Sequence, residues 1–321
     1  MKVLVTGGAG AIGSHVVEAL LERSDEVGVL DSFHDFYPRE RKERNLETAR
    51  KSAGFAGLWE VDIRDADGVA GCLRELRPDA LIHLAARAGV RPSLVEPAAY
   101  MDVNMTGTAT LLDAASKAGV SRVVFASSSS VYGERPRGPF AEDDPADRPL
   151  SPYGASKRGG ELLCHSFHRT AGLPITCLRF FTVYGPRQRP DLAIHKFARL
   201  ALAGEPIPVF GDGTSERDFT FVSDLVDGVL RALDRAEGYR VYNLGRGVPV
   251  TLNETIAALE RALGVAVKRS ILPAQTGDLP RTWASIERAR AELGYEPRVE
   301  LREGLDRFVR WLREEDGCAP S

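Results

Sequence analysis

Short apolar runs alternate with longer stretches of helical spacing along the first half of the chain. Runs of apolar and β-branched residues predict buried strands at Lys2–Thr6, Glu26–Leu30, Leu58–Val61, Asp79–Leu84 and Val120–Ala126. Apolar residues three and four apart predict helices at Ile12–Arg23, Pro97–Ala118 and Pro152–Thr170. This alternation predicts a parallel sheet with helices on both faces. We therefore expect an α/β fold of the doubly wound Rossmann type, which binds ligands at the carboxyl ends of its strands.

A glycine turn joins the first predicted strand to the first predicted helix. Gly7, Gly10 and Gly13 are spaced as G-x-x-G-x-x-G, with Ala11 and Ile12 inside the motif. Glycines permit a tight turn and let a pyrophosphate approach the N-terminus of the helix closely. A turn with only a structural role is the alternative, but the position between a strand and a helix favours a dinucleotide site.

Polar residues stand at the ends of the second and third predicted strands. Asp31 can accept hydrogen bonds from both adenosine ribose hydroxyls and would repel a 2′-phosphate, which favours NAD over NADP. A simple strand-end turn into Ser32 is the alternative. Asp62 and Ile63 offer an adenine ring an acceptor for its amino group and an apolar face. The charged segment His34–Ser52 is predicted to be a solvated surface helix.

Small residues follow the fourth predicted strand and would let the chain pass close beneath a dinucleotide. This segment begins with Leu84, Ala85 and Ala86. Arg91, just beyond it, is a candidate for binding an anionic substrate, although an exposed arginine needs no function. Asn104, inside the long helical pattern, is a candidate for a buried polar anchor near the cofactor.

The helical pattern at Pro152 begins with two candidate catalytic groups. Tyr153 and Lys157 are four residues apart and lie on one helical face, and Ser151 is a suitable N-cap before the proline. A nearby cation favours a phenolate, so Lys157 is predicted to lower the pKa of Tyr153. By itself this motif is most often a solvated helix face. Ser127–Ser130, after the fifth strand, add hydroxyls that can bond to a reacting carbonyl.

Composition and charge narrow the classes of function. The chain has 321 residues, of which 43% are hydrophobic and 27% charged, as in an ordinary globular protein. A net charge of −3 gives no basic field for nucleic acid or an anionic membrane. We find no signal peptide and no apolar stretch long enough to span a membrane. The four cysteines lack metal spacing and predict free thiols in the cytoplasm, and the histidines lack ligand spacing, so we expect no metal.

The second half of the chain predicts a smaller lobe that interrupts the first. Helices are expected at Ala193–Ala203, Val222–Ala236 with Ser223 as cap, Leu252–Leu263 ended by Gly264, and Leu301–Glu314. Pro206–Phe210 is expected to be extended before a Gly211–Gly213 turn, and Arg240–Leu244 to return to the main sheet. We assign residues 1–178 with part of 220–246 to the dinucleotide domain, and 179–219 with 247–321 to a substrate domain.

The motifs, in this order, resemble the extended short-chain dehydrogenase/reductase family, and most closely its nucleotide-sugar 4-epimerases. The likeness covers essentially the whole chain and rests on Thr6–Gly13 (TGGAGAIG), His83–Ala86 (HLAA), Ser127–Gly133 (SSSSVYG), Tyr153–Lys157 (YGASK), Arg179–Gly185 (RFFTVYG) and Arg217–Phe219 (RDF). The resemblance implies a Rossmann domain with a smaller α/β substrate-binding domain, and NAD as cofactor. It implies that Tyr153 is the base, Lys157 its partner and Ser128 the assisting hydroxyl, with Ser129 as the alternative.

The resemblance also implies a binding site for a UDP-sugar. It implies that Phe180 contacts the cofactor, Arg217 the diphosphate and Asp278 the ribose, and that Val209 and Phe210 flank the pyrimidine. Many relatives carry a second diphosphate cation where this chain has Gln275, and Arg281 is one possible replacement.

Arg179–Ala193 looks most like the corresponding stretch of UDP-glucuronate 4-epimerases. In those enzymes a Thr and an Arg, at the positions of Thr182 and Arg189, surround the sugar carboxylate. An arginine fork matches a carboxylate well, although Arg189 could instead be a surface charge. An epimerase of neutral UDP-hexoses, or of both kinds of sugar, is the nearest alternative. The acids that dehydratases and decarboxylases of the family place after the catalytic hydroxyl are replaced here by Ser129 and Ser130.

The implied reaction passes through a transient 4-keto sugar, with NAD as a bound catalyst. More remote alternatives are a net dehydrogenase and a non-catalytic NAD-sensing protein on the same fold. The helices Pro97–Ala118 and Pro152–Thr170 are expected to pair across a two-fold axis as a four-helix bundle, as in relatives, which predicts a homodimer.

Overall fold

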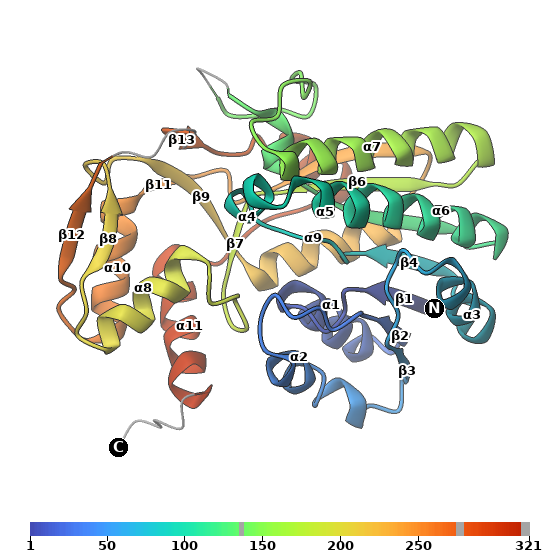
Figure 1. The fold of residues 1–321 in the computed structure, drawn as a ribbon, viewed down its shortest axis with the longest axis horizontal. Coiled ribbons are helices and arrows are strands. Elements are labelled where there is room, and N and C mark those ends of the chain that lie inside the picture. The colour runs from blue at the N-terminus through green and yellow to red at the C-terminus, as the bar shows by residue number, and fades with distance from the viewer. Residues whose placement is uncertain (135–137, 274–278, 316–321) are drawn as a thin grey trace.

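A seven-stranded parallel sheet forms the centre of the molecule. The computed structural model describes residues 1–134, 138–273 and 279–315. The sheet order is β10-β6-β5-β4-β1-β2-β3, and every neighbouring pair is parallel (Figure 1). The strands are β1 Lys2–Thr6, β2 Glu26–Leu30, β3 Phe55–Trp59, β4 Ala80–His83, β5 Arg122–Ser128, β6 Ile175–Phe180 and β10 Tyr239–Leu244. This order, with its reversal between β1 and β4, is that of a Rossmann fold and confirms the predicted class.

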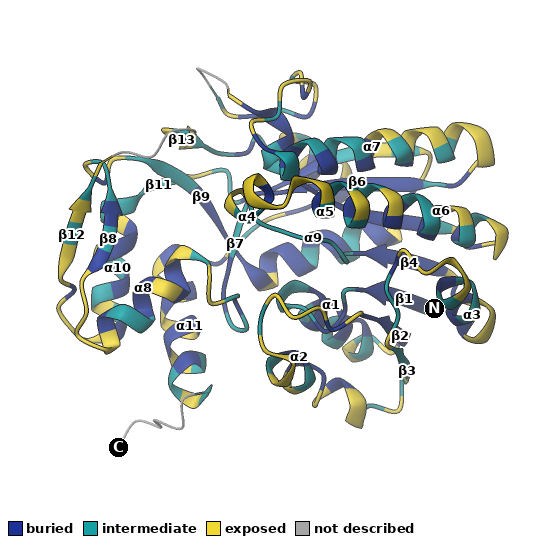
Figure 2. Cartoon of the chain, viewed as in Figure 1, coloured by how far each residue is buried: buried dark blue, intermediate teal, exposed yellow. Residues whose placement is uncertain are grey.

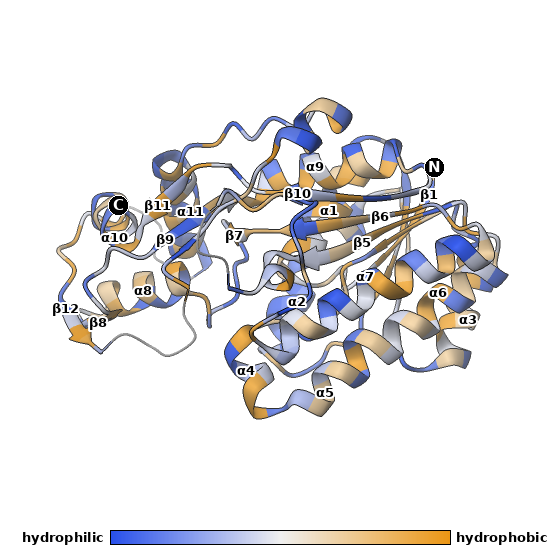
Figure 3. Cartoon of the chain, turned by 90° about the horizontal axis from the view of Figure 1, so that it is seen from above, coloured by the Kyte–Doolittle hydropathy of each residue, from blue (hydrophilic) through white to orange (hydrophobic). Residues whose placement is uncertain are grey.

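Helices cover both faces of this sheet. Figure 3 shows the apolar strands between α9 on one side and α3, α6 and α7 on the other. The helices are α1 Ala11–Glu22, α2 Arg39–Asn45, α3 Ala66–Leu76, α4 Val90–Val95, α5 Pro97–Met101, α6 Gly107–Lys117, α7 Pro152–Ala171 and α9 Val222–Asp234, with short 3₁₀ turns at η1 Ala49–Lys51 and η3 Ser129–Tyr132. Alternate residues of β1 enter different cores, Val3 and Val5 on one face and Leu4 on the other. The inner strands β1, β4, β5 and β6 are therefore buried on both sides (Figure 2).

A π turn interrupts the long helix that was predicted for Pro97–Ala118. The segment runs as α5, then the π turn η2 Asp102–Thr106, then α6. The extra residue of a π turn shifts the facing of the side chains beyond it, and such turns are frequent at functional sites. Asn104 lies within this turn.

A smaller lobe is built mainly from the second half of the chain. Its four-stranded sheet contains β7 Thr182–Tyr184, β9 Glu216–Phe221, β11 Pro249–Thr251 and β13 Arg281–Thr282, and a second sheet pairs β8 Ile207–Phe210 with β12 Arg269–Leu272. Its helices are α8 Ala193–Leu202, α10 Leu252–Leu263, the π turn η4 Ala289–Leu293 and α11 Leu301–Glu315. β10 leaves this part of the chain and joins the main sheet beside β6, as predicted.

Several local expectations are corrected. β3 begins at Phe55 and ends at Trp59, and β5 begins two residues later than predicted, at Arg122. The sequence pattern did not predict α3. Ser223 does not cap α9, because Phe221 is the N-cap residue and no side chain bonds there. By contrast, α10 has a full capping box, since Thr251 accepts from the Glu254 amide and the Glu254 carboxylate accepts from the Thr251 amide.

Candidate active site

A cleft opens at the carboxyl ends of the strands of the main sheet, where the sequence predicted a dinucleotide site. The predicted cofactor residues that line it are Gly7, Gly10, Ala11, Ile12, Gly13, Asp31, Ser32, Asp62, Ile63, Leu84, Ala85, Ala86, Tyr153, Lys157 and Phe180. The same wall contains Tyr37, Lys42, Arg87 and Ser127, which the sequence analysis did not assign to the cofactor. The topology thus brings segments that are far apart in the chain to one cleft, as expected at a switch point of a doubly wound sheet.

The glycine turn leaves no room for side chains. Gly7 has φ +69°, and a Cβ there would lie 2.8 Å from the Ala85 amide nitrogen. A Cβ on Gly13 would lie 2.1 Å from the Gly7 carbonyl oxygen. The turn therefore packs directly against the end of β4 and presents backbone at the N-terminus of α1, which is the cradle that a pyrophosphate requires.

Asp31 is held rigidly at the end of β2. Its carboxylate accepts hydrogen bonds from the Ala9 amide at 3.1 Å and the Phe33 amide at 2.9 Å. The Lys42 ammonium lies 3.7 Å from the same carboxylate and donates to the His34 carbonyl at 2.8 Å. Asp31 and Lys42 are both buried, yet both line the cleft.

The prediction of a solvated helix at His34–Ser52 is wrong for one face of this segment. Lys42, Asn45, Leu46 and Ala49 are buried, and the Asn45 amide donates to the Ala9 carbonyl at 3.0 Å. These residues recur at a spacing of three and four, which is the helical signal that the surrounding charges concealed. The segment covers the glycine turn and contributes Lys42 to the cleft.

The predicted adenine-binding residues stand at the end of the β3 segment. The Asp62 carboxylate forms an ion pair with Arg64 at 2.7 Å, and hydrogen bonds from the Arg64 side chain and amide hold its pKa below the usual value. The Ile63 side chain is buried against the cleft. An adenine amino group would share the Asp62 carboxylate with Arg64.

The proposed catalytic groups come from the N-terminus of α7 and the end of β5. Ser151 caps the helix by accepting from the Gly154 amide at 3.1 Å, and Pro152 occupies its first turn, as predicted. The Lys157 ammonium donates to the Ala126 carbonyl at 2.8 Å, and burial lowers its pKa to about 8.

The sequence predicted a lowered pKa for Tyr153, but in the structure the net effect is a raised pKa. Burial raises this pKa, and it outweighs the hydrogen bond from Ser128 and the charge of Arg189, which both lower it. The Tyr100 ring packs edge-on against the Tyr153 ring, with the ring centroids 6.2 Å apart, and adds to this burial. The sequence missed Arg189 as an electrostatic partner of the phenol because the two residues lie far apart in the chain.

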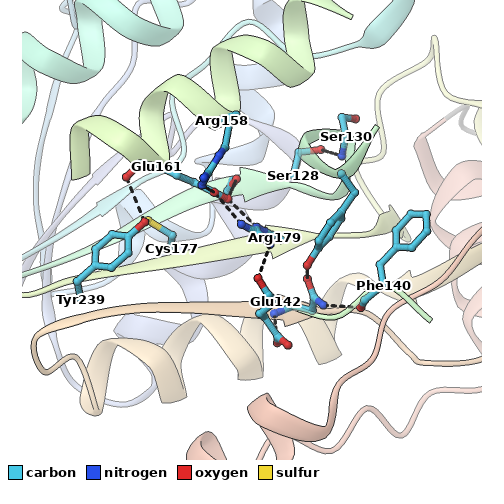
Figure 4. Close-up of polar contacts among 12 residues, drawn as sticks. Ser128, Ser130, Phe140, Glu142, Arg158, Glu161, Cys177, Arg179 and Tyr239 are labelled. Carbon is cyan, nitrogen blue, oxygen red and sulfur yellow. Dashed lines mark hydrogen bonds and ion pairs between the residues drawn. The ribbon is translucent and has the colours of Figure 1, made fainter. Parts of the chain in front are cut away.

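Ser128 is the serine of its run that meets Tyr153. It also accepts a hydrogen bond from the Ser130 amide at 3.2 Å, which caps the short turn η3 (Figure 4). Ser129 is half-buried at the first position of that turn. Of the four serines, Ser127 is the one among the residues that line the cleft.

Asn104 is confirmed as a buried polar anchor and lies one step behind the cleft wall. Its amide nitrogen donates to the Arg87 carbonyl at 2.9 Å and to the Ser156 hydroxyl at 2.9 Å, and its carbonyl accepts from the Arg87 amide at 2.8 Å. Both amide hydrogens are committed to the protein. Asn104 thus positions the segment after β4, and it is not among the residues that line the cleft.

Arg189 reaches the cleft wall from the loop after β7. Its guanidinium forms two hydrogen bonds to the Asp191 carboxylate, at 3.0 and 2.9 Å, and lies 5.0 Å from the centre of the Phe36 ring. Its side chain is 16% exposed. Arg189 is therefore a partly buried residue of the cleft wall that is paired with an exposed carboxylate.

The other predicted substrate residues lie in the smaller lobe or at its border. The Arg91 guanidinium stacks over the Phe210 ring, 5.5 Å from its centre, so these two predicted substrate residues contact each other. Val209 is 1% exposed and packs in the core, so the prediction that its side chain flanks a pyrimidine ring is corrected. The strand alternation that buries Val209 turns Phe210 outward.

The remaining predicted substrate residues lie in the smaller lobe or outside the described residues. Thr182 is half-buried in β7, and Arg217 in β9 donates to the Glu216 carbonyl at 2.8 Å. Arg281 forms an ion pair with Glu216 and stacks over the Trp283 ring at 4.0 Å. Asp278 and Gln275 lie outside the described residues.

The described part of the chain contains neither a cluster of metal-ligating side chains nor a helix suited to cross a membrane. No group of three or more His, Cys, Asp or Glu side chains within it is arranged to hold a metal ion. Cys72, Cys164 and Cys177 are buried free thiols. None of the helices in residues 1–134, 138–273 and 279–315 has the length and apolar character of a membrane span.

Comparison with known proteins identifies the family. Residues 3–245 match the model of the NAD dependent epimerase/dehydratase family. The chain belongs to this family. A UDP-glucuronate 4-epimerase of Thermodesulfobacterium geofontis is 42% identical over 313 residues, which cover 97% of this chain and 96% of that protein. The predicted family resemblance is confirmed.

Solved structures of the same family match over nearly the whole chain. A UDP-glucuronic acid 4-epimerase of Bacillus cereus, in complex with UDP-glucuronic acid and NAD, is 37% identical with a TM-score of 0.92, over 98% of this chain and 100% of that one. A UDP-glucose 4-epimerase of Thermotoga maritima, with UDP-glucose, is 35% identical with a TM-score of 0.90, over 98% of this chain and 99% of that one.

Proposed function

We propose that this protein is an NAD-dependent isomerase that interconverts UDP-glucuronate and UDP-galacturonate by inversion at C4. The observation that carries the proposal is the presence of Arg189 and Tyr153 in the wall of one cleft that also contains the glycine turn and Asp31. The relatives named as UDP-glucuronate 4-epimerases support the same substrate.

The cleft fits NAD. The glycine turn would accept the pyrophosphate, and Asp31 would accept the adenosine ribose hydroxyls, with Lys42 beside them as a further donor. NAD, when bound, supplies the acceptor for a hydride from C4 and returns the hydride to the opposite face.

Tyr153 would act on the proton of the 4-hydroxyl. As a phenolate it accepts this proton when the keto sugar forms, and it returns the proton when the alcohol is restored. Ser128 donates a hydrogen bond that favours the phenolate, and the positive charge of Arg189 favours it as well. Lys157 is anchored to the Ala126 carbonyl and keeps further donor hydrogens for a ribose hydroxyl.

Arg189 and Thr182 would orient the sugar carboxylate. A 4-keto glucuronate is a β-keto acid, and it loses carbon dioxide only when the bond to the carboxylate aligns with the carbonyl π system. A carboxylate held away from that alignment is protected, which is control by orientation. The guanidinium keeps donor hydrogens beyond the two that it gives to Asp191.

A neutral UDP-hexose is the second candidate substrate, because Asp191 already offsets the charge of Arg189. The UDP-glucose epimerase of similar fold fits this alternative. The test is to incubate purified protein separately with UDP-glucuronate and UDP-glucose, separate the products, and compare kcat/KM. A higher kcat/KM for UDP-glucuronate, with a galacturonate product and no UDP-pentose, supports the proposal. A higher value for UDP-glucose refutes the substrate, and no turnover of either refutes the enzyme.

We further infer which part of the chain binds each ligand, how the protein assembles and in which compartment it is located. Residues 1–178 with part of 220–246 would hold NAD, and residues 179–219 with 247–321 the nucleotide sugar. Leu162 exposes an apolar side chain on α7, and Leu94 and Val95 expose theirs on the preceding α4. These side chains support a homodimer in which α5–α6 and α7 pair with the partner's copies as a four-helix bundle. The buried free thiols support a reducing compartment such as the cytoplasm.

A further inference from the structure

The end of β5 and one stripe of α7 are joined residue by residue. The pairs are Ala126 with Lys157, Ser127 with Glu161, and Ser128 with Tyr153. In the middle pair the Ser127 hydroxyl donates to the Glu161 carboxylate at 2.6 Å. Tyr153, Lys157 and Glu161 are spaced by four, so Glu161 continues the helical stripe that carries the proposed catalytic groups.

Four donors fix the Glu161 carboxylate. One oxygen accepts from Ser127 and from the Arg179 Nε at 2.8 Å, and the other accepts from the Arg179 Nη2 at 2.9 Å and from Arg158 at 2.8 Å. Figure 4 shows Arg158 and Arg179 converging on this side chain. Burial alone would raise the pKa of Glu161, but the bonds and charge of Arg179 hold it below its usual value. An ionised carboxylate with every lone-pair site occupied has a single orientation.

Arg179 ties this carboxylate to the sheet. It pairs in register with Ser127 across β5 and β6, and its side chain is 3% exposed. It donates to the Glu142 carbonyl at 3.1 Å and stacks over the Tyr132 ring at 4.7 Å. Both ends of the ion pair are therefore held, one on α7 and the other on β6.

A buried ion pair of this kind is a weak source of stability. Removing two charges from water costs as much as their attraction returns, and apolar replacements of both partners are often neutral. What such a pair supplies is one fixed geometry between the elements that it joins. Here one of those elements is α7, which carries Tyr153 and Lys157, and the other is β6, which pairs in register with β5, the strand that carries Ser128.

We propose that Glu161, held by Arg179, is a positioning residue that sets the placement of Ser127 and Ser128 against Tyr153 and Lys157. The proposal rests on the proposed function, because the geometry matters only if Tyr153 transfers a proton. Proton transfer needs hydrogen-bond distance between the groups, and a displacement of about 1 Å costs up to about 100-fold in rate. Glu161 touches neither the substrate nor the cofactor in this account.

Three variants test the proposal in the full-length holoenzyme. Ser127→Ala removes the link between Glu161 and β5, together with one hydroxyl of the cleft wall, and leaves the ion pair intact. The double variant Glu161→Leu/Arg179→Met replaces the pair by apolar side chains and leaves no buried charge unpaired. The double variant keeps that hydroxyl, so a fall in kcat common to both variants comes from the loss of the link. Arg158→Gln is the matched control, because Arg158 also donates to Glu161 but is 32% exposed, and its replacement keeps the bonds of Glu161 to Ser127 and Arg179.

The expected result separates kcat from KM. We expect kcat with UDP-glucuronate to fall about 10-fold in Ser127→Ala and about 100-fold in the double variant, with KM changed less than about twofold. Bound NAD and the thermal unfolding midpoint should stay near those of the wild-type protein. Arg158→Gln should keep the wild-type kcat.

A second measurement does not depend on turnover. The near-ultraviolet absorbance of tyrosinate, taken as the difference between each protein and its Tyr153→Phe counterpart, gives the titration of Tyr153. The groups that act on or pack against this phenol are Ser128, Arg189 and Tyr100, and the substitutions alter none of them directly. Displacement of Ser128 should raise the titration midpoint in Ser127→Ala and in the double variant.

The outcomes are distinct. Wild-type kcat and an unchanged Tyr153 midpoint in folded Ser127→Ala would overturn the positioning role, even if the double variant fails to fold. A fall in kcat that Arg158→Gln shares would overturn it as well. If the wild-type protein turns over no UDP-sugar, the proposed function fails, and the Tyr153 midpoints alone then decide whether Glu161 positions the phenol.

Discussion

Replacing Arg189 by methionine tests the substrate preference most directly. The guanidinium lies in the cleft wall and is held by two hydrogen bonds to Asp191. A hydrogen bond to a charged group contributes about 1.5–3 kcal/mol. Since about 1.4 kcal/mol corresponds to a tenfold change, Arg189→Met should raise KM for UDP-glucuronate roughly 10- to 150-fold. KM for UDP-glucose, which has no carboxylate, should change less than about threefold.

The same substitution should change the pH dependence with both substrates. The charge of Arg189 lowers the Tyr153 pKa, so its removal raises that pKa. Because the phenolate is the active form, activity at a given pH below the pKa falls, and the acidic limb of the kcat profile moves to higher pH. This shift is common to UDP-glucuronate and UDP-glucose, whereas the change in KM is specific to the acid.

The assay is initial-rate epimerisation of each substrate over a range of pH, with separation of the epimers. Arg189→Met leaves the Asp191 carboxylate without this partner and adds repulsion, so Arg189→Met/Asp191→Asn is the matched control. The KM effect should persist in the double variant. Equal increases of KM for UDP-glucuronate and UDP-glucose would refute the assignment of Arg189 to the sugar carboxylate.

Three further predictions concern the base, the cofactor turn and a buried histidine. Tyr153→Phe should lose more than about 99% of kcat but retain NAD, measured by release of cofactor on denaturation; undiminished turnover would exclude it as the base. Gly13→Ala should purify without NAD, because its Cβ would lie 2.1 Å from the Gly7 carbonyl oxygen, and full occupancy would argue against the glycine cradle. Burial, followed by the charge of Lys157, lowers the pKa of His83 to about 3, so the folded protein binds fewer protons than the unfolded chain below pH about 6.5. Stability is then lost as the pH falls, and His83→Gln should lose about 2 kcal/mol less than wild type between pH about 6.5 and about 5 in urea unfolding.

The order of elements and much of the cleft could be predicted from local pattern. Apolar runs of strand length and the glycine turn depend on interactions between neighbours in the chain, so Lys2–Thr6 and Glu26–Leu30 were predicted residue for residue. Parallel strands place their carboxyl ends at one edge, which is why Asp31 and Tyr153 could be predicted to share a site.

Other features depended on partners that are distant in sequence. Lys42 was hidden in a charged segment, because its burial comes from packing over the glycine turn. The burial of Val209 depends on which face of β8 meets the core. Burial raises the pKa of Tyr153 and the charge of Arg189 lowers it. The balance between these two effects cannot be predicted from the spacing of residues along the chain.

The sequence by itself determined the doubly wound sheet, its glycine turn and the chemical types gathered at its edge, because hydrophobic period and turn chemistry are local properties. Only the tertiary structure decided which charges face the phenol and that Glu161 and Arg179 lock α7 to the sheet. Electrostatic energies depend on distance in space and on exclusion of water, and both are defined only once the chain has folded.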